Sequence, residues 1–172
     1  MRGEGFEALA DGTLLLTVLV VASGVVASFA NVSRDDGRAA ALRYAEETRV
    51  ALFGTTVDDF RYRVGDEVVT MRNGTSIEAF LRLEVHLLLG GPGAFDFTAA
   101  NARIATLAVR LVRSGWTVVV LGGPARGSDL VQLPNGTVLP PDYAASSWTY
   151  PALDGTARDT RLTLALWINP RR

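Results

Sequence analysis

The sequence predicts an α+β protein: an N-terminal transmembrane helix and stalk, followed by a small domain with two helices packed on a mainly antiparallel sheet. Three observations support this fold class. An uncharged apolar run fills residues 12–33, helical periodicity fills two segments in the middle of the chain, and alternating or β-branched segments lie on both sides of those helices. Helices grouped between strands are typical of an α+β layer packed on one sheet.

The apolar run has the length of a single membrane span. Residues 12–33 carry no charge, and a helix of this length extends for about 33 Å, enough for a hydrocarbon core of roughly 30 Å. A cleaved signal peptide remains the alternative, but the apolar run exceeds the usual roughly 7 to 15 residues. Its basic n-region is also weak, because one arginine is outnumbered by three acids: Arg2 against Glu4, Glu7 and Asp11. A membrane span is therefore preferred to a signal peptide or a buried core helix.

Three domains are predicted along the chain. Residues 1–33 form a leader and transmembrane helix, residues 34–54 a helical stalk, and residues 55–172 a soluble, extracytoplasmic α+β domain. The stalk is rich in alanine, which favours a helix. Its apolar residues, among them Ala45 and Leu52, recur at helical spacing.

The soluble domain opens with a predicted β-hairpin and a capped helix. Residues 58–76 alternate between apolar and polar on either side of Gly65, which is the pattern of a hairpin. Thr75 and Glu78 have the spacing of a capping box. They predict a helix over residues 76–89 that stops at the Gly-Gly-Pro that follows.

A second helix and further strands complete the domain. Helical spacing begins near Thr98, and Gly115 closes the helix. Residues 116–123 are β-branched and indicate a buried strand. Residues 129–140 are expected to form a hairpin around their Asn-Gly pair, and residues 158–168 a closing strand with leucines on one face.

Composition excludes several classes of function. The formal net charge is -1, so the whole protein exerts no long-range attraction on nucleic acid or anionic lipid. All 17 basic residues are arginine, whose planar guanidinium donates bidentately. The chain contains no cysteine, which excludes disulfides, a thiolate nucleophile, iron–sulfur clusters and cysteine-ligated zinc.

Two residues of the first soluble helix bear on possible chemistry. The only histidine, His86, follows Arg82 at i,i+4 spacing on the polar side, so we expect a solvated residue and not a metal ligand or catalytic base. Glu84 falls on the apolar side, where a carboxylate needs a partner or a raised pKa. We expect a structural ion pair with an arginine from elsewhere in the fold. The alternative, a lone general acid or base, has no second catalytic group at a suitable spacing.

The second helix carries a basic stripe. Arg103, Arg110 and Arg113 share one sector of the helical wheel, opposite Ile104 and Leu107. Such a stripe is usually a solvated face and less often a docking surface for an acidic partner or lipid headgroups. Three arginines without interleaved aromatic residues do not indicate nucleic acid. The stripe is the candidate partner-binding surface.

No constellation of residues indicates an enzyme, a cofactor or a small-molecule substrate. The Gly-rich segment 118–129 lacks the spacing of a phosphate-binding loop and has no helix after it, so it is interpreted as a turn. Ser128 and Asp129 have no triad partner at hand, and no nucleophile elbow occurs. The sequence therefore predicts a protein without catalytic residues, metal ions or cofactors.

Sequons bear on the side of the membrane that the domain occupies. Asn73 and Asn135 begin Asn-x-Ser/Thr sequons at expected turns, and Asn31 begins a third at the membrane edge. Asn73 and Asn135 are candidate glycosylation sites, and the set favours a domain outside the cell. The positive-inside rule favours the opposite, because one arginine precedes the span and four follow it: Arg2, then Arg34, Arg38, Arg43 and Arg49. The rule weakens for long following domains, so the outside is preferred.

The N-terminal residues show a characteristic order of segments. A short polar leader with glycines precedes an apolar helix, a stalk and a small β-rich domain, and this order resembles the type IV pilin-like proteins, in particular archaeal pilins, archaellins and pseudopilin-like proteins. The resemblance implies cleavage after Gly5, which leaves Phe6 as the first mature residue, or after Gly3. Two positions depart from the family pattern: Glu4 stands where a basic residue is usual, and Ala10 where many pilins carry glutamate.

The expected function follows from that resemblance. It implies a non-enzymatic, single-pass protein of the cell membrane, a pilin-like or minor pseudopilin-like subunit of a pilus or secretion-type surface assembly. Its partners would be the lipid bilayer and other assembly proteins. The alternative is a membrane-tethered extracytoplasmic domain that binds a partner through its sheet or its arginine stripe. A third class, an anchored hydrolase, lacks a nucleophile, a metal site and an acid–base pair in this sequence.

Overall fold

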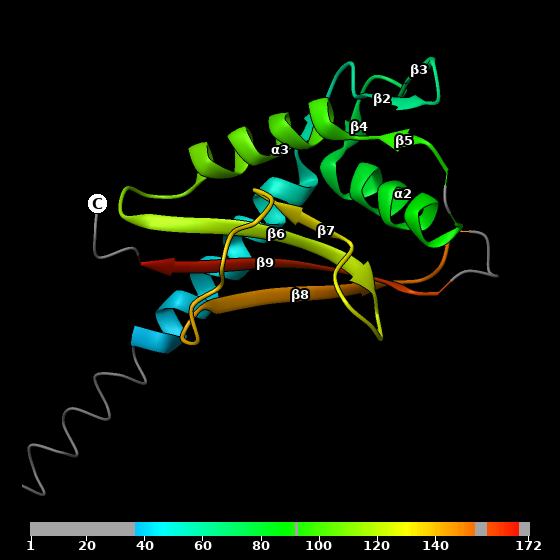
Figure 1. Cartoon of the computed structure of the whole chain (residues 1–172). Coiled ribbons are helices and arrows are strands. Elements are labelled where there is room, and N and C mark those ends of the chain that lie inside the picture. The colour runs from blue at the N-terminus through cyan, green and yellow to red at the C-terminus, as the bar shows by residue number, and fades with distance from the viewer. Residues whose placement is uncertain (1–36, 92, 154–157, 169–172) are drawn as a thin grey trace, which may run out of the picture. The chain divides into compact units, whose positions relative to one another are not determined.

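The protein is described by a computed structural model that covers residues 37–91, 93–153 and 158–168 (Figure 1). Those residues form three helices and nine strands. The chain divides into two compact units, Met1–Ala40 and Ala41–Arg172, and the elements that pack on one another belong to the second. The expected membrane span falls outside the described residues. Within them, every helix is too short or too polar to cross a bilayer.

Helix 37–54, blue to cyan in Figure 1, packs on the folded domain with its residues from Ala41 onward. Ala45, Leu52 and Phe53 are at most 2% exposed and belong to the main hydrophobic core. Removing apolar surface from water stabilises the protein by about 25 cal/mol per Å², so this face of the helix is buried instead of remaining a solvated stalk. The domain boundary expected at residue 54 therefore differs from the compact unit, which begins at Ala41.

A four-stranded antiparallel sheet forms the centre of the domain. Its strands are β6 (Trp116–Pro124), β7 (Val131–Leu133), β8 (Ala144–Tyr150) and β9 (Thr160–Ile168), and their order is β7-β6-β9-β8. The two longest strands, β6 and β9, pair with each other over nine residues each. Both strands were predicted from their β-branched and alternating patterns, and both predictions are confirmed.

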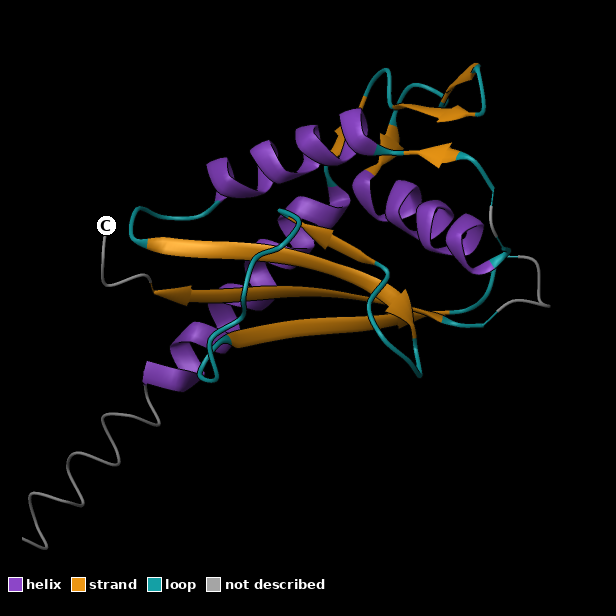
Figure 2. Cartoon of the chain, in the orientation of Figure 1, coloured by secondary structure: helices purple, strands orange, loops and turns teal. Residues whose placement is uncertain are grey.

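The two faces of this sheet are covered by different elements. In Figure 2 helix 37–54 passes behind the sheet, whereas the connection over residues 134–143 crosses in front of it. Helix α2 (Ile77–Leu89) lies on the same face as helix 37–54. A Cβ added to Gly122 would meet Val85 of α2 and Leu162 of β9. Arg49 of helix 37–54 bonds to Ser146, whose partner Leu164 points to the same side of β9 as Leu162. The alternation expected in β9 is confirmed, since three leucines face these helices: Leu162, Leu164 and Leu166.

Helices α2 and α3 (Thr98–Leu111) contact both the central sheet and two smaller antiparallel sheets. In one small sheet β1 (Thr56–Val57) pairs with β4 (Thr75–Ser76). In the other the order is β3-β2-β5, with bounds Glu67–Thr70, Arg61–Val64 and Phe95–Asp96. The predicted hairpin is confirmed as β2 and β3, joined through Gly65 at a φ of 59°. The prediction of a single sheet is wrong. The described residues form three sheets, because the short strands pair with one another and not with the central sheet.

The N-cap of α2 is one residue later than predicted. Ser76 Oγ accepts a hydrogen bond from Ala79 N at 3.1 Å, whereas the hydroxyl of Thr75 donates to Arg72 O. The expected capping box at Thr75 is therefore wrong, because pairing with Val57 holds Thr75 in β4. The helix itself is confirmed: it covers Ile77–Leu89.

The hairpin predicted around Asn135 is also wrong. β7 forms its hairpin with β6, where Leu133 lies opposite Val120, and Pro134 cannot extend the strand because it lacks an N–H group. Residues 134–143 instead lead to β8. That strand was not predicted, since its sequence AASSWTY shows neither a β-branched run nor a clear apolar alternation.

Candidate functional site

A pocket of about 370 Å³ lies between α2, α3 and β7. Glu84 of α2, Asn101 of α3 and residues 130–135 around β7 are among its lining residues. We call it the Glu84 pocket. A pocket that contains a buried ionisable group is a candidate functional site, because such groups carry the perturbed pKa values on which chemistry and ligand binding depend.

Glu84 is buried as the sequence predicted, but its partner is a different residue. Its exposed fraction is 3%, because α2 places it three and four residues after the buried Leu81 and Phe80. Asn101 Nδ2 donates a hydrogen bond of 2.7 Å to Glu84 Oε1. Burial raises the pKa of Glu84 to about 7, and the hydrogen bond from Asn101 opposes that shift.

The expected ion pair between Glu84 and an arginine does not occur among the described residues. The nearest arginine on α2, Arg82, forms an ion pair with Glu78 at 3.5 Å. It also donates to Pro151 O at 3.1 Å, and its guanidinium lies 4.9 Å from the ring centroid of Tyr150. The prediction of an arginine from elsewhere in the fold is wrong because Asn101 of α3, and not an arginine, lies against Glu84.

Two buried oxygen atoms without hydrogen-bond partners in the described part of the chain indicate which protonation state of Glu84 fits the Glu84 pocket. Glu84 Oε2 and Asn101 Oδ1 have no hydrogen-bond partner among the described residues. A protonated carboxyl and a primary amide each offer one donor and one acceptor to the other. A carboxylate, by contrast, leaves buried acceptors unsatisfied, which costs about 1–3 kcal/mol for each group. The environment therefore favours a protonated Glu84 up to near-neutral pH.

His86 does not join Glu84 in an acid–base pair. It follows Glu84 by two positions on α2, a spacing at which side chains point to different sides of a helix. The sequence predicts a solvated histidine, but His86 is half-buried, and its Nδ1 has no partner among the described residues. The Glu84 pocket thus holds a single proton-binding group close to a hydrogen-bonding amide.

The structure divides the predicted arginine stripe. Arg103 donates to Asp58 O at 3.2 Å, and Arg113 lies beyond the end of α3 with its guanidinium 4.9 Å from the ring centroid of Tyr44. Arg110 is exposed and makes no ion pair or hydrogen bond with the described residues. A shallow groove of about 360 Å³ runs beside Arg103 and Arg110. Two of the three arginines therefore contact other elements of the domain, and Arg110 remains available at the surface.

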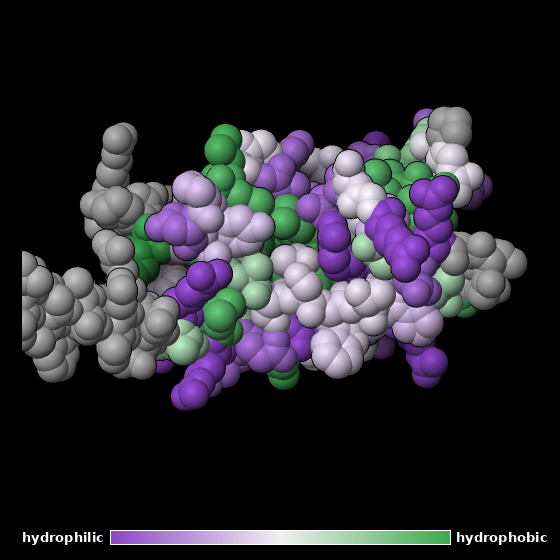
Figure 3. Space-filling model, turned by 90° about the horizontal axis from the view of Figure 1, so that it is seen from below, coloured by the Kyte–Doolittle hydropathy of each residue, from purple (hydrophilic) through white to green (hydrophobic). Residues whose placement is uncertain are grey.

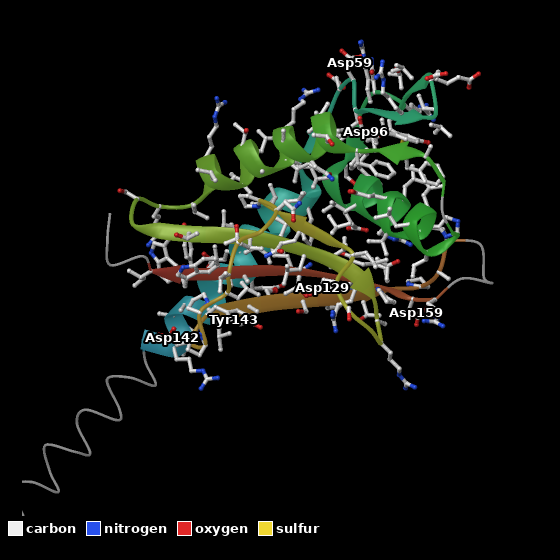
Figure 4. All side chains as sticks on the ribbon, viewed as in Figure 1. Asp59, Asp96, Asp129, Asp142, Tyr143 and Asp159 are labelled. Carbon is white, nitrogen blue, oxygen red and sulfur yellow. The ribbon has the colours of Figure 1, made fainter. Side chains whose placement is uncertain are left out.

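The acidic side chains labelled in Figure 4 are dispersed over the domain. Asp59 and Asp96 lie by the small sheets, Asp142 lies near the start of β8, and Asp129 and Asp159 lie towards the other end of the central sheet. Asp129 forms an ion pair of 3.0 Å with Arg161, so the Gly-rich segment serves as a turn that this pair anchors. Over the described ranges no three residues among histidine, cysteine, aspartate and glutamate are grouped to hold a metal ion.

The two candidate glycosylation sites in the soluble domain are exposed. Asn73 and Asn135 each precede a glycine with positive φ, 80° at Gly74 and 74° at Gly136. Both asparagines are therefore in turns, as predicted. The candidate processing residues Gly5 and Phe6, like Asn31, lie outside the described residues.

The sequence did not reveal a polar cluster that joins helix 37–54 to β8. Arg49 is 8% exposed and donates to Glu46 Oε1 at 2.6 Å and to Ser146 Oγ at 2.9 Å. Ser146 Oγ also bonds to Glu46, and hydrogen bonds from Arg49 and Ser146, the first being the stronger effect, lower the pKa of Glu46 to about 2. The Arg49 guanidinium lies 5.7 Å from the ring centroid of Trp148. The i,i+3 spacing of Glu46 and Arg49 was visible in the sequence, but their contact with β8 was not.

Comparisons with protein-family models, with curated proteins and with solved structures found no match. The class of protein is therefore the one that the fold defines: a small α+β domain built on antiparallel sheets, with helix 37–54 as a part of it from Ala41 onward.

Proposed function

We propose that the chain is a single-pass membrane protein that serves as a pilin-like or minor pseudopilin-like subunit of a surface assembly, with its folded domain outside the cell. One observation carries the proposal. Helix 37–54 directly follows the apolar run in the sequence, and its residues from Ala41 onward pack on an antiparallel sheet. This matches the order of segments in the proteins that the N-terminal residues resemble.

The packing of helix 37–54 on the sheet suits a subunit that is held in place by the apolar run that precedes this helix. Phe53 is buried in the core, and the rings of Tyr44 and Trp116 meet edge to face with centroids 5.2 Å apart. The buried Arg49 adds hydrogen bonds across to β8. Because close-packed interiors transmit displacement, a helix attached in this way carries the domain with it as one body.

A membrane-tethered binding domain is the second candidate. It is favoured by the exposed Arg110, which lines the groove beside α3. Such a domain would keep its partner after removal of residues 1–33. An assembly subunit would lose its assembled state after the same truncation.

The first experiment tests the anchor. In the variant with Leu19→Arg and Val20→Arg, each arginine costs about 2.5–3.5 kcal/mol at the centre of a span, so we expect the protein to leave the membrane fraction. The matched control, Leu19→Val with Val20→Leu, keeps the composition of the run and should stay in the membrane. If both variants and the wild type fractionate alike, the proposed anchor is wrong.

The second experiment identifies the mature N-terminus in a host with pilin-processing machinery. N-terminal sequencing of membrane-derived protein should give Phe6 or Glu4 for a processed assembly subunit. Met1 would favour the tethered binding domain instead. Asn31 would mean a secreted protein and would refute membrane anchoring.

A further inference from the structure

Strand β8 forms an open edge of the central sheet. In the order β7-β6-β9-β8 it pairs with β9 alone, and within the described ranges its main chain makes no backbone hydrogen bond beyond that pairing. Its seven residues extend for about 23 Å. One side of β8 therefore presents a row of unpaired N–H and C=O groups, which is a template for another strand.

This edge lacks the features by which edge strands usually resist pairing. Charged residues, proline, bulges and shortness are the common protections, and β8 contains no charge and no proline. The opposite edge, β7, is only three residues long. The edge strand β3 of the small sheet begins with Glu67. Among these edges, β8 is long, uncharged and uninterrupted.

The surface along β8 is neither strongly hydrophilic nor strongly hydrophobic, and it carries an exposed aromatic ring. Figure 3 views the molecule from the side on which β8 forms the sheet edge in Figure 1, and pale surface fills the middle of this view between strongly hydrophilic groups. Trp148 is 56% exposed. Partly exposed tryptophan is typical of the residues that anchor protein interfaces.

The strand is complementary to itself in one antiparallel register. When Ser147 lies opposite Ser147 of a second copy, all seven residues of both strands pair. In that register Trp148 faces Ser146 and Tyr150 faces Ala144, so each large ring meets a small side chain across the strands. Any other register leaves residues unpaired at both ends.

The register also gives the tryptophan of the second copy a favourable neighbour. Ser146 Oγ accepts a hydrogen bond from Arg49 Nε, so a ring opposite Ser146 comes close to the Arg49 guanidinium. That guanidinium already lies beside Trp148 of its own chain, at 5.7 Å from the ring centroid. Arginine between two tryptophan rings is a stabilising cation–π arrangement.

We propose that two copies of this chain associate through β8, antiparallel and centred on Ser147, so that two four-stranded sheets become one continuous sheet. The contact is isologous, since the same patch is used on both copies, and it closes at two copies because each open edge is then occupied. The proposal depends only on the folded domain. It does not rest on the proposed function and can fail independently of it.

Engineered cysteines test the register, because the chain has no cysteine of its own. The experiment uses the full chain in a non-ionic detergent, oxidised with copper phenanthroline. In the variant Ser147→Cys the two Cα atoms would lie about 4.5–5.5 Å apart, which is within the range for a disulfide of roughly 4.4–6.8 Å. Thr149→Cys is the matched control. It is exposed on the same face of β8, but its two copies would be about 13 Å apart, four residues out of register.

We expect a yield of disulfide-linked dimer about tenfold or more higher for Ser147→Cys than for Thr149→Cys, read on a non-reducing gel. The double variant Ala145→Cys with Thr149→Cys should also cross-link, because these positions face each other across the register. It keeps the test decisive if Ser147→Cys folds poorly after losing its hydroxyl contact of 2.7 Å with Thr163. Equal yields from Ser147→Cys and Thr149→Cys overturn the proposal. So does the absence of dimer in both Ser147→Cys and the double variant, which would leave the edge to a different strand.

Discussion

Replacing Glu84 by glutamine tests whether its buried carboxyl group keeps a proton in the folded protein. The pKa of this group rises from 4.5 to about 7 on folding, mainly through burial. Between these pH values the folded state binds one more proton than the unfolded state, so the free energy of unfolding falls as pH rises. The stabilising contribution is fully present below pH 4.5 and is lost as pH rises through about 7. The shift corresponds to a loss of about 3 kcal/mol.

Glutamine should remove this loss. It is neutral at every pH, and its amide group can both accept from Asn101 Nδ2 and donate to Asn101 Oδ1. We therefore expect Glu84→Gln to match the wild type near pH 4.5 and to exceed its free energy of unfolding by about 3 kcal/mol at pH 8. In thermal unfolding followed by tryptophan fluorescence, this difference is a Tm about 10 °C higher at pH 8.

The control is Glu47→Gln, which removes a carboxyl group at an exposed position of helix 37–54. It should leave the pH dependence of stability as it is in the wild type. If Glu84→Gln and the wild type lose stability equally between pH 4.5 and pH 8, the buried proton is not on Glu84 and the reasoning is refuted.

Three further substitutions test the packing and the caps. Phe53→Ala should lower the free energy of unfolding by about 3–5 kcal/mol because Phe53 is buried. Its control, Val50→Ala on the exposed side of the same helix, should change the free energy of unfolding by less than about 0.5 kcal/mol. Equal effects of the two substitutions in chemical denaturation would mean that the helix does not pack on the sheet. Ser76→Ala should cost about 1 kcal/mol, because it removes the side chain that caps α2, and an unchanged unfolding midpoint would show that another group caps the helix. Gly123→Ala should cost about 1–3 kcal/mol, because its new Cβ would lie 2.7 Å from Ser128 O; unchanged stability would mean that the neighbouring turn moves freely.

Local patterns were sufficient for the elements that carry a strong period. The helix over Ile77–Leu89 and the strand over Thr160–Ile168 agree with their predicted bounds to within two residues. In both, the apolar side chains repeat at the period of the element, so burial and local geometry favour the same structure. β8 shows the opposite case. Its small and polar residues have no strong preference of their own, and pairing with β9 makes them a strand.

The Glu84 pocket was predictable in one respect and not in another. A helical wheel places Glu84 on the buried side of α2, and its burial is confirmed. Its partner Asn101 lies 17 positions away on a different helix, and no spacing rule links them. The same holds for Arg49, whose contact with Ser146 joins residues 97 positions apart.

The sequence by itself determined the α+β class, the main helices and long strands, and the presence of one carboxylate on a buried face, because each depends on the order of neighbouring residues. Tertiary structure alone decided that helix 37–54 belongs to the core, that Glu84 meets an amide and not an arginine, and that β8 is the open edge. The physical reason is that these features depend on contacts between distant segments. Their free energy comes from burial and hydrogen bonding between residues that the chain brings together only when it folds.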